Sequence, residues 1–322
     1  MKSHTIVYLD QNYLSNLAKA RYCLMKDESQ AKFWRQFFEN LQNAVLGDSI
    51  RIPMSEFHEI ETLDIHIQGA IKNTLAQLSV GFQFRDWHSI LEWQIIDAVT
   101  QFSGMKLTSN YHPVFQSDPN TAVKDRFKDM IINRGTISLT SYWVADPNSI
   151  RELKVRFVNV TKQSLGKWPG TQNCSSSLVL ASKLNWLSSS LINEPDFWYH
   201  IIQDITRLGI QESVINDYWI TGKILDIPFI DVFSSLFAVL YFKYKKGGQN
   251  VKRGDLFDIS ALATVLPYCS IVTTDKSMKE MVVHDLKYNE KYKAEIFSCT
   301  EKDRIDLHNR IKQSLNTNQI PC

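Results

Sequence analysis

The chain has 322 residues, of which 44% are hydrophobic and 22% charged, a composition typical of globular proteins that excludes disorder as the main state. Its 36 basic and 34 acidic residues leave a formal charge of +2, which excludes a polybasic, histone-like binder but allows a local basic groove. The length predicts about two domains, or one domain with a large insertion.

The apolar segments and the cysteines bear on the cellular compartment of the protein. The longest apolar segment, residues 227–242, contains Pro228 and Asp231 and is too short to cross a membrane, so we interpret it as a core helix. No positively charged lead precedes an apolar segment at the start, so nothing indicates secretion. The five cysteines are scattered and form no C-x-x-C pair, which favours reduced thiols. Together these features predict a cytoplasmic protein that does not span a membrane.

Residues 1–64 have the pattern of an α/β fold. A β-branched and aromatic run, TIVYL, is typical of a strand buried on both faces, and helical spacing begins soon after it. The predicted elements are a strand over 5–9, a helix from Tyr13, an amphipathic helix around 33–45, a strand over 50–54 and a helix from its N-cap Ser55 through Glu61.

The pattern changes over residues 65–225, where helical segments alternate with loops rich in Pro, Asn, Ser and Gly. We predict a mainly helical insertion here. Its predicted elements are helices over 91–102, 150–158, 176–191 and 196–208, and a strand over 137–144.

The α/β pattern returns over residues 226–322. Short strands that alternate with helices favour a parallel sheet covered by helices on both faces, so the predicted fold class is α/β. The predicted elements are helices over 231–246 and 255–265, strands over 271–274 and 294–298, and a last helix capped by Thr300 and ending near residue 315.

Four carboxylates follow predicted strands or begin or lie in nearby helices, at positions that a parallel sheet would bring together. Clustered carboxylates repel one another, and their usual reason is to bind a hard divalent cation such as Mg²⁺ or Mn²⁺. Such an ion can generate a hydroxide nucleophile and neutralise charge during phosphoryl transfer. The four are Asp10 after the first strand, Glu61 in the helix after the second, Asp258 in the first turn of a helix and Asp275 after a later strand.

Three segments resemble motifs of one nuclease family. IVYLDQNYLSNLA is similar to the opening motif of PIN-domain nucleases, where an Asp ends the first strand and an Asn follows two residues later, here Asp10 and Asn12. PMSEFHEIET resembles their second motif, with a Ser after a strand and a Glu six residues further on, here Ser55 and Glu61.

The third segment, GDLFDISALATVLPYCSIVTTDKSM, resembles the third and fourth PIN motifs. An Asp opens an alanine-bearing helix and a later strand ends in Thr-x-Asp, which matches Asp258, Thr273 and Asp275. The resemblance covers about residues 3–64 and 228–300, and the residues of these motifs are most similar to those of long bacterial PIN-like proteins. It departs from the family at Gln11, where many members have a small or hydroxyl residue, and in the long insertion.

The resemblance implies a metal-dependent endonuclease that acts on RNA or, less often, on DNA. The four acidic residues would hold one or two Mg²⁺ or Mn²⁺ ions, and Asn12 and Thr273 would orient ligands or water. A metal-bound hydroxide would attack the phosphate and leave a 5′-phosphate and a 3′-hydroxyl. Residues 1–64 and 226–322 would form a PIN-like domain around the 65–225 insertion. A toxin or defence role, and a regulatory partner or homo-oligomer that restrains the enzyme, fit such a protein.

Each acidic residue also has a structural interpretation. Asp10 and Asp275 would serve only as N-caps of the helices that follow them. Asp255 and Asp258 fit an N-cap and N3 pair favoured by the helix dipole, and we interpret Asp255 as mainly structural, beside a ligand at Asp258.

The helix that carries Glu61 offers further alternatives. Glu61 competes with Glu56 and Glu59 on this helix, each of the three can also be interpreted as a solvated surface acid, and Glu56 is the first substitute for Glu61 as the ligand. His58 precedes Glu61 by three residues and shares its face, so it either contacts a ligand carboxylate or phosphate or is a hydrogen-bonded structural histidine. The string HEIET is not a zinc-protease motif, because Thr62 stands where the second His is required.

A basic segment, YFKYKKGGQNVKRGD, precedes Asp255 and interleaves aromatic with basic residues. On a nuclease it would track phosphates and stack bases, whereas the alternative is a solvated helix end, since cations favour helix C-termini. The predicted nucleic-acid contacts are Lys243, Lys245, Lys246, Lys252 and Arg253.

Two other functions compete with the nuclease. A PIN-like RNA-binding or interaction scaffold would keep the fold without metal. A haloacid-dehalogenase-like phosphatase is disfavoured, because the segment from Gly254 to Asp258 is one residue short of its GD-x-x-x-D element and Asn12 replaces its second Asp.

Overall fold

The computed structural model describes residues 5–62, 65–106, 114–116, 195–245, 247, 252 and 254–317. Their contacts divide the chain into two compact units. Of the described residues, unit 1 contains 5–85, 115–116 and 268–317, and unit 2 contains 86–114 and 195–267. The predicted elements over 137–144, 150–158 and 176–191 lie outside the described residues.

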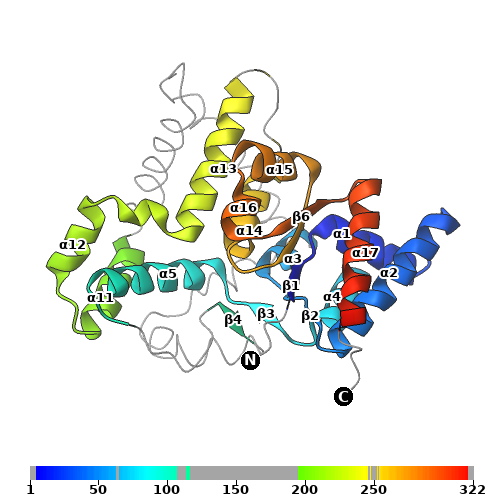
Figure 1. The fold of residues 1–322 in the computed structure, drawn as a ribbon, viewed down its shortest axis with the longest axis horizontal. Coiled ribbons are helices and arrows are strands. Elements are labelled where there is room, and N and C mark those ends of the chain that lie inside the picture. The colour runs from blue at the N-terminus through cyan, green and yellow to red at the C-terminus, as the bar shows by residue number, and fades with distance from the viewer. Residues whose placement is uncertain are drawn as a thin grey trace. The chain divides into compact units, whose positions relative to one another are not determined.

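Unit 1 is built on a four-stranded sheet in the order β2-β1-β5-β6, with every pair of neighbours parallel. Its strands are β1 (Thr5–Tyr8), β2 (Ile50–Arg51), β5 (Ile271–Thr274) and β6 (Glu295–Ser298). β1 and β5 meet in the middle of the sheet, where Val7 lies opposite Ile271. The prediction of an α/β fold with a parallel sheet flanked by helices is confirmed (Figure 1).

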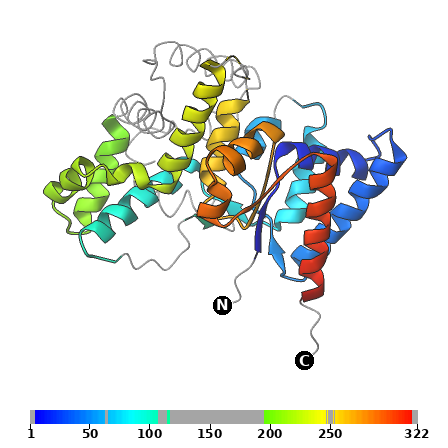
Figure 2. The same ribbon diagram turned by 45° about the horizontal axis from the view of Figure 1, so that its top comes forward.

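Helices α1, α2, α4 and α17 pack together and form the main core of unit 1. α2 buries Trp34, Phe37 and Leu41 at spacings of three and four residues, as its amphipathic pattern predicts. α2 and α17 lie side by side in Figures 1 and 2. The helices of unit 1 are α1 (Gln11–Arg21), α2 (Glu28–Leu46), α3 (Glu56–Thr62), α4 (Gln68–Ser79), α15 (Lys276–Glu280), the π-helical turn η3 (Met281–Asp285), α16 (Tyr288–Tyr292) and α17 (Glu301–Thr317).

A small antiparallel pair, β3 (Gln83–Phe84) with β4 (Phe115–Gln116), was not expected. Each strand has two residues, too few to produce a recognisable alternation. The predicted strand over 50–54 is also shorter than expected, because β2 ends at Arg51 and Met54 bridges to Gln83 instead.

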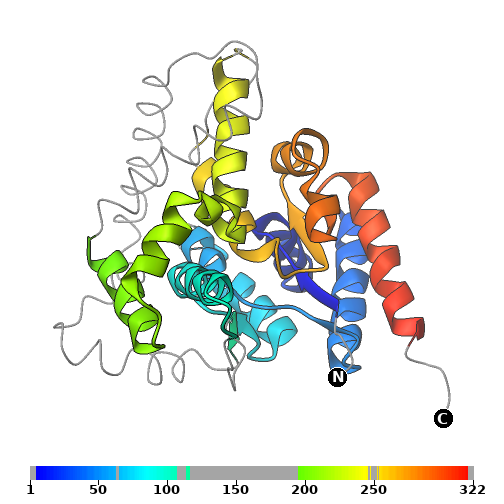
Figure 3. The same cartoon turned by 60° about the vertical axis from the view of Figure 1, so that its left-hand side comes forward.

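Unit 2 is mainly helical (Figure 3). Its central helix is α5, which contacts each of α11, α12, α13 and α14 and is buried on most sides. The elements are α5 (Trp87–Phe102), α11 (Pro195–Arg207), α12 (Glu212–Ile220), the 3₁₀ turn η2 (Lys223–Asp226), α13 (Pro228–Lys245) and α14 (Asp255–Val265). α13 and α14 therefore group with unit 2, not with the sheet. In the part of the chain that the structure describes, no helix has the length and apolar character of a membrane span.

Candidate functional site

The carboxyl ends of β1 and β5 lie at the topological switch point of the sheet. β1 leads to β2 on one side of it and β5 leads to β6 on the other, so the two chain connections diverge between β1 and β5. Open α/β sheets bind their ligands at such a switch point. Asp10 follows β1 and Asp275 follows β5, so two of the predicted acids stand on the two neighbouring strands of this switch point.

Asp10 is held by the two residues that the motifs assign to its support. The Asp10 amide donates to Thr273 Oγ1 at 2.6 Å, and the same hydroxyl donates to Asp10 Oδ1 at 3.1 Å. Asn12 Nδ2 donates to Asp10 Oδ2 at 3.1 Å. Residues separated by 263 positions in the chain are thus joined at the switch point, and the carboxylate has a fixed orientation.

Burial dominates the protonation of Asp10. It raises the pKa of this carboxyl above its ordinary value, although hydrogen bonds from the Tyr13 amide, Asn12 and Thr273 act in the opposite direction. A cation beside Asp10 would favour the charged form against the effect of burial, as a bound metal ion does for a carboxylate ligand.

Both strand-end acids also cap helices, as their structural interpretation predicts. Asp10 Oδ1 accepts from the Tyr13 amide at 3.2 Å and caps α1. Asp275 Oδ1 accepts from the Met278 amide at 2.7 Å and caps α15. Capping occupies one oxygen of each carboxylate, so it does not by itself prevent metal binding.

The oxygen donors at this edge fit a hard divalent cation in kind, since carboxylate and hydroxyl oxygens are its usual ligands. Within the described ranges, however, no three His, Cys, Asp or Glu side chains lie close enough together to hold an ion. The Mg²⁺ or Mn²⁺ site stays a prediction.

His58 is a structural, hydrogen-bonded histidine. It is 2% exposed, its Nε2 lies 2.7 Å from the Leu9 carbonyl oxygen, and its Nδ1 accepts from the Ser55 amide at 3.1 Å. These partners require the neutral ring with the proton on Nε2. Burial lowers the pKa of His58 to about 4, and the bond to Leu9 opposes this only in part. His58 fixes the start of α3 to the residue before Asp10.

Ser55 and Tyr8 complete this network. The Ser55 hydroxyl lies 3.3 Å from His58 Nδ1 and 3.3 Å from the Tyr8 hydroxyl, and the Tyr8 and His58 rings stack at 4.8 Å. His58 takes the place that Glu or Gln has in a capping box, because its side chain bonds the amide of the residue before α3. Sequence reasoning did not find Tyr8, since a tyrosine inside a buried strand matches any core position.

Glu61 lies on α3 one turn after His58 and is partly exposed. Burial, the charge of Glu61 and the charge of Asp10 all raise the pKa of Tyr8, so both carboxylates act on one hydroxyl. Glu61 therefore belongs to the same neighbourhood as Asp10. Glu56, the alternative ligand, lies in the first turn of α3.

Asp255 and Asp258 lie in the first turn of α14 in unit 2, and their predicted helix has the observed bounds. The expectation that Asp255 is the N-cap is wrong, because Gly254 occupies that position and makes no side-chain cap. Asp255 is 1% exposed and its Oδ2 instead accepts from the Lys252 amide at 2.6 Å, which closes the preceding turn. The assignment of Asp258 as a ligand stays a prediction.

The predicted nucleic-acid segment is only partly described. Lys243 is half-buried on α13 and Lys252 is exposed. Lys246, Arg253 and the side chain of Lys245 lie outside the described residues. The predicted contact of this segment with nucleic acid therefore stays a prediction.

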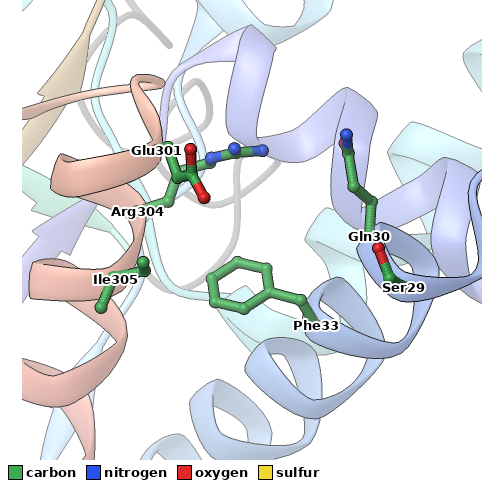
Figure 4. Close-up of a pocket in the computed structure, with 6 residues that line it drawn as sticks. All are labelled: Ser29, Gln30, Phe33, Glu301, Arg304 and Ile305. Carbon is green, nitrogen blue, oxygen red and sulfur yellow. The ribbon is translucent and has the colours of Figure 1, made fainter.

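Two features of unit 1 were not predicted. Lys279 Nζ contacts both carboxylate oxygens of Asp303, at 2.8 and 2.7 Å, and the Ser298 amide donates to the same group at 2.7 Å, which ties α15 and β6 to α17. Burial raises the pKa of Asp303, but the bonds from Lys279 and Ser298 outweigh it and lower the pKa. The second feature is a pocket between α2 and α17 (Figure 4).

A comparison of this chain with protein-family models, with curated proteins and with solved structures finds no match. The fold class rests on the sheet topology, and the PIN-like identity stays a prediction.

Proposed function

We propose that the protein is a metal-dependent endonuclease with a PIN-like fold, acting on RNA in preference to DNA. The observation that supports this most is the pair of acids at the switch point of the parallel sheet, with Thr273 and Asn12 bonded to Asp10. A buried carboxylate that is oriented in advance by hydroxyl and amide donors is typical of a supported metal ligand.

Asp10, Glu61 and Asp275 are the residues of unit 1 that would hold Mg²⁺ or Mn²⁺, provided that their side chains draw closer together around the ion than they lie in this structure, and the sequence adds Asp258. When bound, the ion would activate water and neutralise the charge that develops on the phosphate. Thr273 and Asn12 would keep Asp10 in one rotamer, since they bond its two different oxygens. The cap bonds to Asp10 and Asp275 would further limit the motion of both side chains.

A non-catalytic RNA-binding scaffold is the second candidate. It is favoured by the hydrogen bonds that already engage both oxygens of Asp10 and by the capping role of both strand-end acids. In a scaffold, Asp10 would serve the fold alone.

Cleavage of a labelled RNA in Mn²⁺ separates the two candidates. We expect Asp10→Asn to lower the cleavage rate by about 100-fold or more, since loss even of a group that only supports a ligand costs about 10–100-fold. Asn is also a good N-cap, so this variant keeps the start of α1 intact. The matched control is Asp306→Asn, an exposed acid on α17, which should cleave like the natural protein.

Equal cleavage by the natural protein and by Asp10→Asn would contradict the proposal. Hydrolysis of para-nitrophenyl phosphate in place of RNA would favour the phosphatase alternative. An identical assay with DNA tests the preference for RNA.

A further inference from the structure

The pocket between α2 and α17 has the composition of a site for a planar, polar ring. It has a volume of about 170 Å³ and opens to solvent. This is smaller than the roughly 300–1,000 Å³ of common small-molecule sites and suits a single ring system. In Figure 4 the Phe33 ring projects from α2 toward α17, and the Arg304 side chain reaches from α17 toward α2. The residues that line it are Ser29, Gln30, Phe33, Glu301, Arg304 and Ile305.

Arg304 has donor capacity that the protein does not use. Its Nε is buried and has no hydrogen-bond partner among the described residues. The guanidinium carbon lies 5.7 Å from the centre of the Trp34 ring, which supports the group from one side. Because Nε is covered, the donors that face a ligand in the pocket are the N–H groups on the two terminal nitrogens of the guanidinium.

Glu301 supplies the opposite charge in the same pocket. It stands three residues before Arg304, close enough on a helix for an ion pair, yet neither residue forms one with any described residue. Among the residues that the structure describes, the pocket therefore presents an acceptor and a donor group that form no ion pair.

The ligand must match both groups. A phosphate is disfavoured, because Glu301 would repel it and because the first amides of α2 are already bonded to Asp27. A nucleobase fits, since its edge carries both donors and acceptors while its faces pack on Phe33 and Ile305. Guanine matches best: O6 and N7 accept from an arginine, and N1–H and N2–H donate to a carboxylate.

We propose that this pocket binds a guanine base of single-stranded RNA, with Arg304 and Glu301 reading its edge. The proposal rests on the proposed function, since it supplies a base preference to the same nuclease. Ring contacts connect the pocket to the start of α1: Arg304 lies over the Trp34 ring, and the centre of that ring is 5.5 Å from the centre of the Tyr13 ring, three residues after Asp10.

Binding of fluorescent RNA octamers to the full chain in EDTA tests this directly. One octamer contains a single guanine among uridines and the other contains uridine alone. We expect the guanine octamer to bind about 10-fold more tightly, within the range of a good bidentate base contact. Arg304→Gln and Glu301→Gln should each reduce this preference to under about 3-fold, whereas Lys302→Gln and Asp306→Asn, exposed neighbours that do not line the pocket, should keep it.

Glu301 is exposed, so its variant stays informative even if Arg304→Gln is unstable. Equal binding of the two octamers, or a preference that both variants retain, would overturn the proposal. Competition by free guanosine monophosphate without any preference between the octamers would also contradict the assignment to RNA. EDTA removes the metal ion, so this binding assay is independent of the cleavage assay in Mn²⁺. A guanine preference in EDTA with no cleavage in Mn²⁺ would contradict only the nuclease. Cleavage in Mn²⁺ with no guanine preference in EDTA would contradict only the pocket.

Discussion

The His58 side chain connects the two chain segments that carry Asp10 and Glu61. Its ring joins the Leu9 carbonyl at the end of β1 to Ser55 at the start of α3 and stacks on Tyr8. Leu9 precedes Asp10, and Glu61 lies one turn further along α3. A single buried ring therefore links the two chain segments that carry two of the predicted ligands.

Replacing His58 with Phe tests this role. The variant keeps the stacked ring but leaves the Leu9 carbonyl and the Ser55 amide without a partner, at about 1–3 kcal/mol for each buried group. We expect the free energy of unfolding at pH 7 to fall by about 2–4 kcal/mol in urea denaturation. His66→Phe, at an exposed position, is the control, and an unchanged midpoint for His58→Phe would contradict the structural role.

Among single residues, the sequence predicts the polar residues of the motifs better than the residues that pack around them in space. Asp10, Asn12 and Thr273 are found through the resemblance, and the structure brings them together. Tyr8 and Arg304 are not found, because their importance depends on which distant side chain lies beside them. Spacing along one segment carries no such information.

At the scale of elements, α4 ends in a strained residue. Val80 has φ of +49° and ψ of +40°, a left-handed conformation that is unfavourable for a β-branched residue, and its side chain is 65% exposed. The side chain thus gains little burial in return for the strain.

Val80→Asn is expected to stabilise the protein by about 0.5–1 kcal/mol, because Asn tolerates the left-handed region better than Val. Thermal unfolding measures the effect as a higher midpoint. Val80→Ile keeps the β-branch and should leave the midpoint near that of the natural protein. A lower midpoint for Val80→Asn would show that the strain is not relieved.

Elements with a strong local pattern are predicted from sequence with nearly correct bounds. α14 and β5 match their predicted ranges, since an apolar helical segment that ends before a proline and a β-branched run are local signals. β3, β4 and the π-helical turn η3 are missed, because they depend on pairing or on a single irregular hydrogen-bond pattern.

At the scale of the whole molecule, three histidines make stability depend on pH. Burial lowers the pKa of His58, His88 and His308 to about 4 each. The unfolded chain binds these protons near pH 6.5, whereas the folded chain stays neutral until about pH 4. Stability is therefore fully present above pH 6.5 and falls as the pH drops toward 4.

The share of His58 alone corresponds to about 3 kcal/mol over this range. We expect urea midpoints measured from pH 7 to pH 4.5 to fall steadily, and His58→Phe to show a shallower dependence than the natural protein. Parallel pH curves for the two proteins would contradict the low pKa of His58.

The grouping of helices into units is beyond what the sequence pattern predicts. α13 and α14 have strong local signals, but their packing against α5 joins residues more than 100 positions apart. Periodicity gives the apolar face of a helix and not the partner of that face. Periodicity equally gives no packing partner for residues 65–225, so their role as an insertion stays a prediction.

The central claim is that the acids at the switch point hold a divalent metal ion, and calorimetric titration of Mn²⁺ into the full chain tests it most directly. We expect saturable uptake of one or two ions by the natural protein and by Asp306→Asn, and a loss of that uptake in Asp10→Asn and in Asp275→Asn. No uptake by the natural protein, or equal uptake by all four proteins, would contradict it.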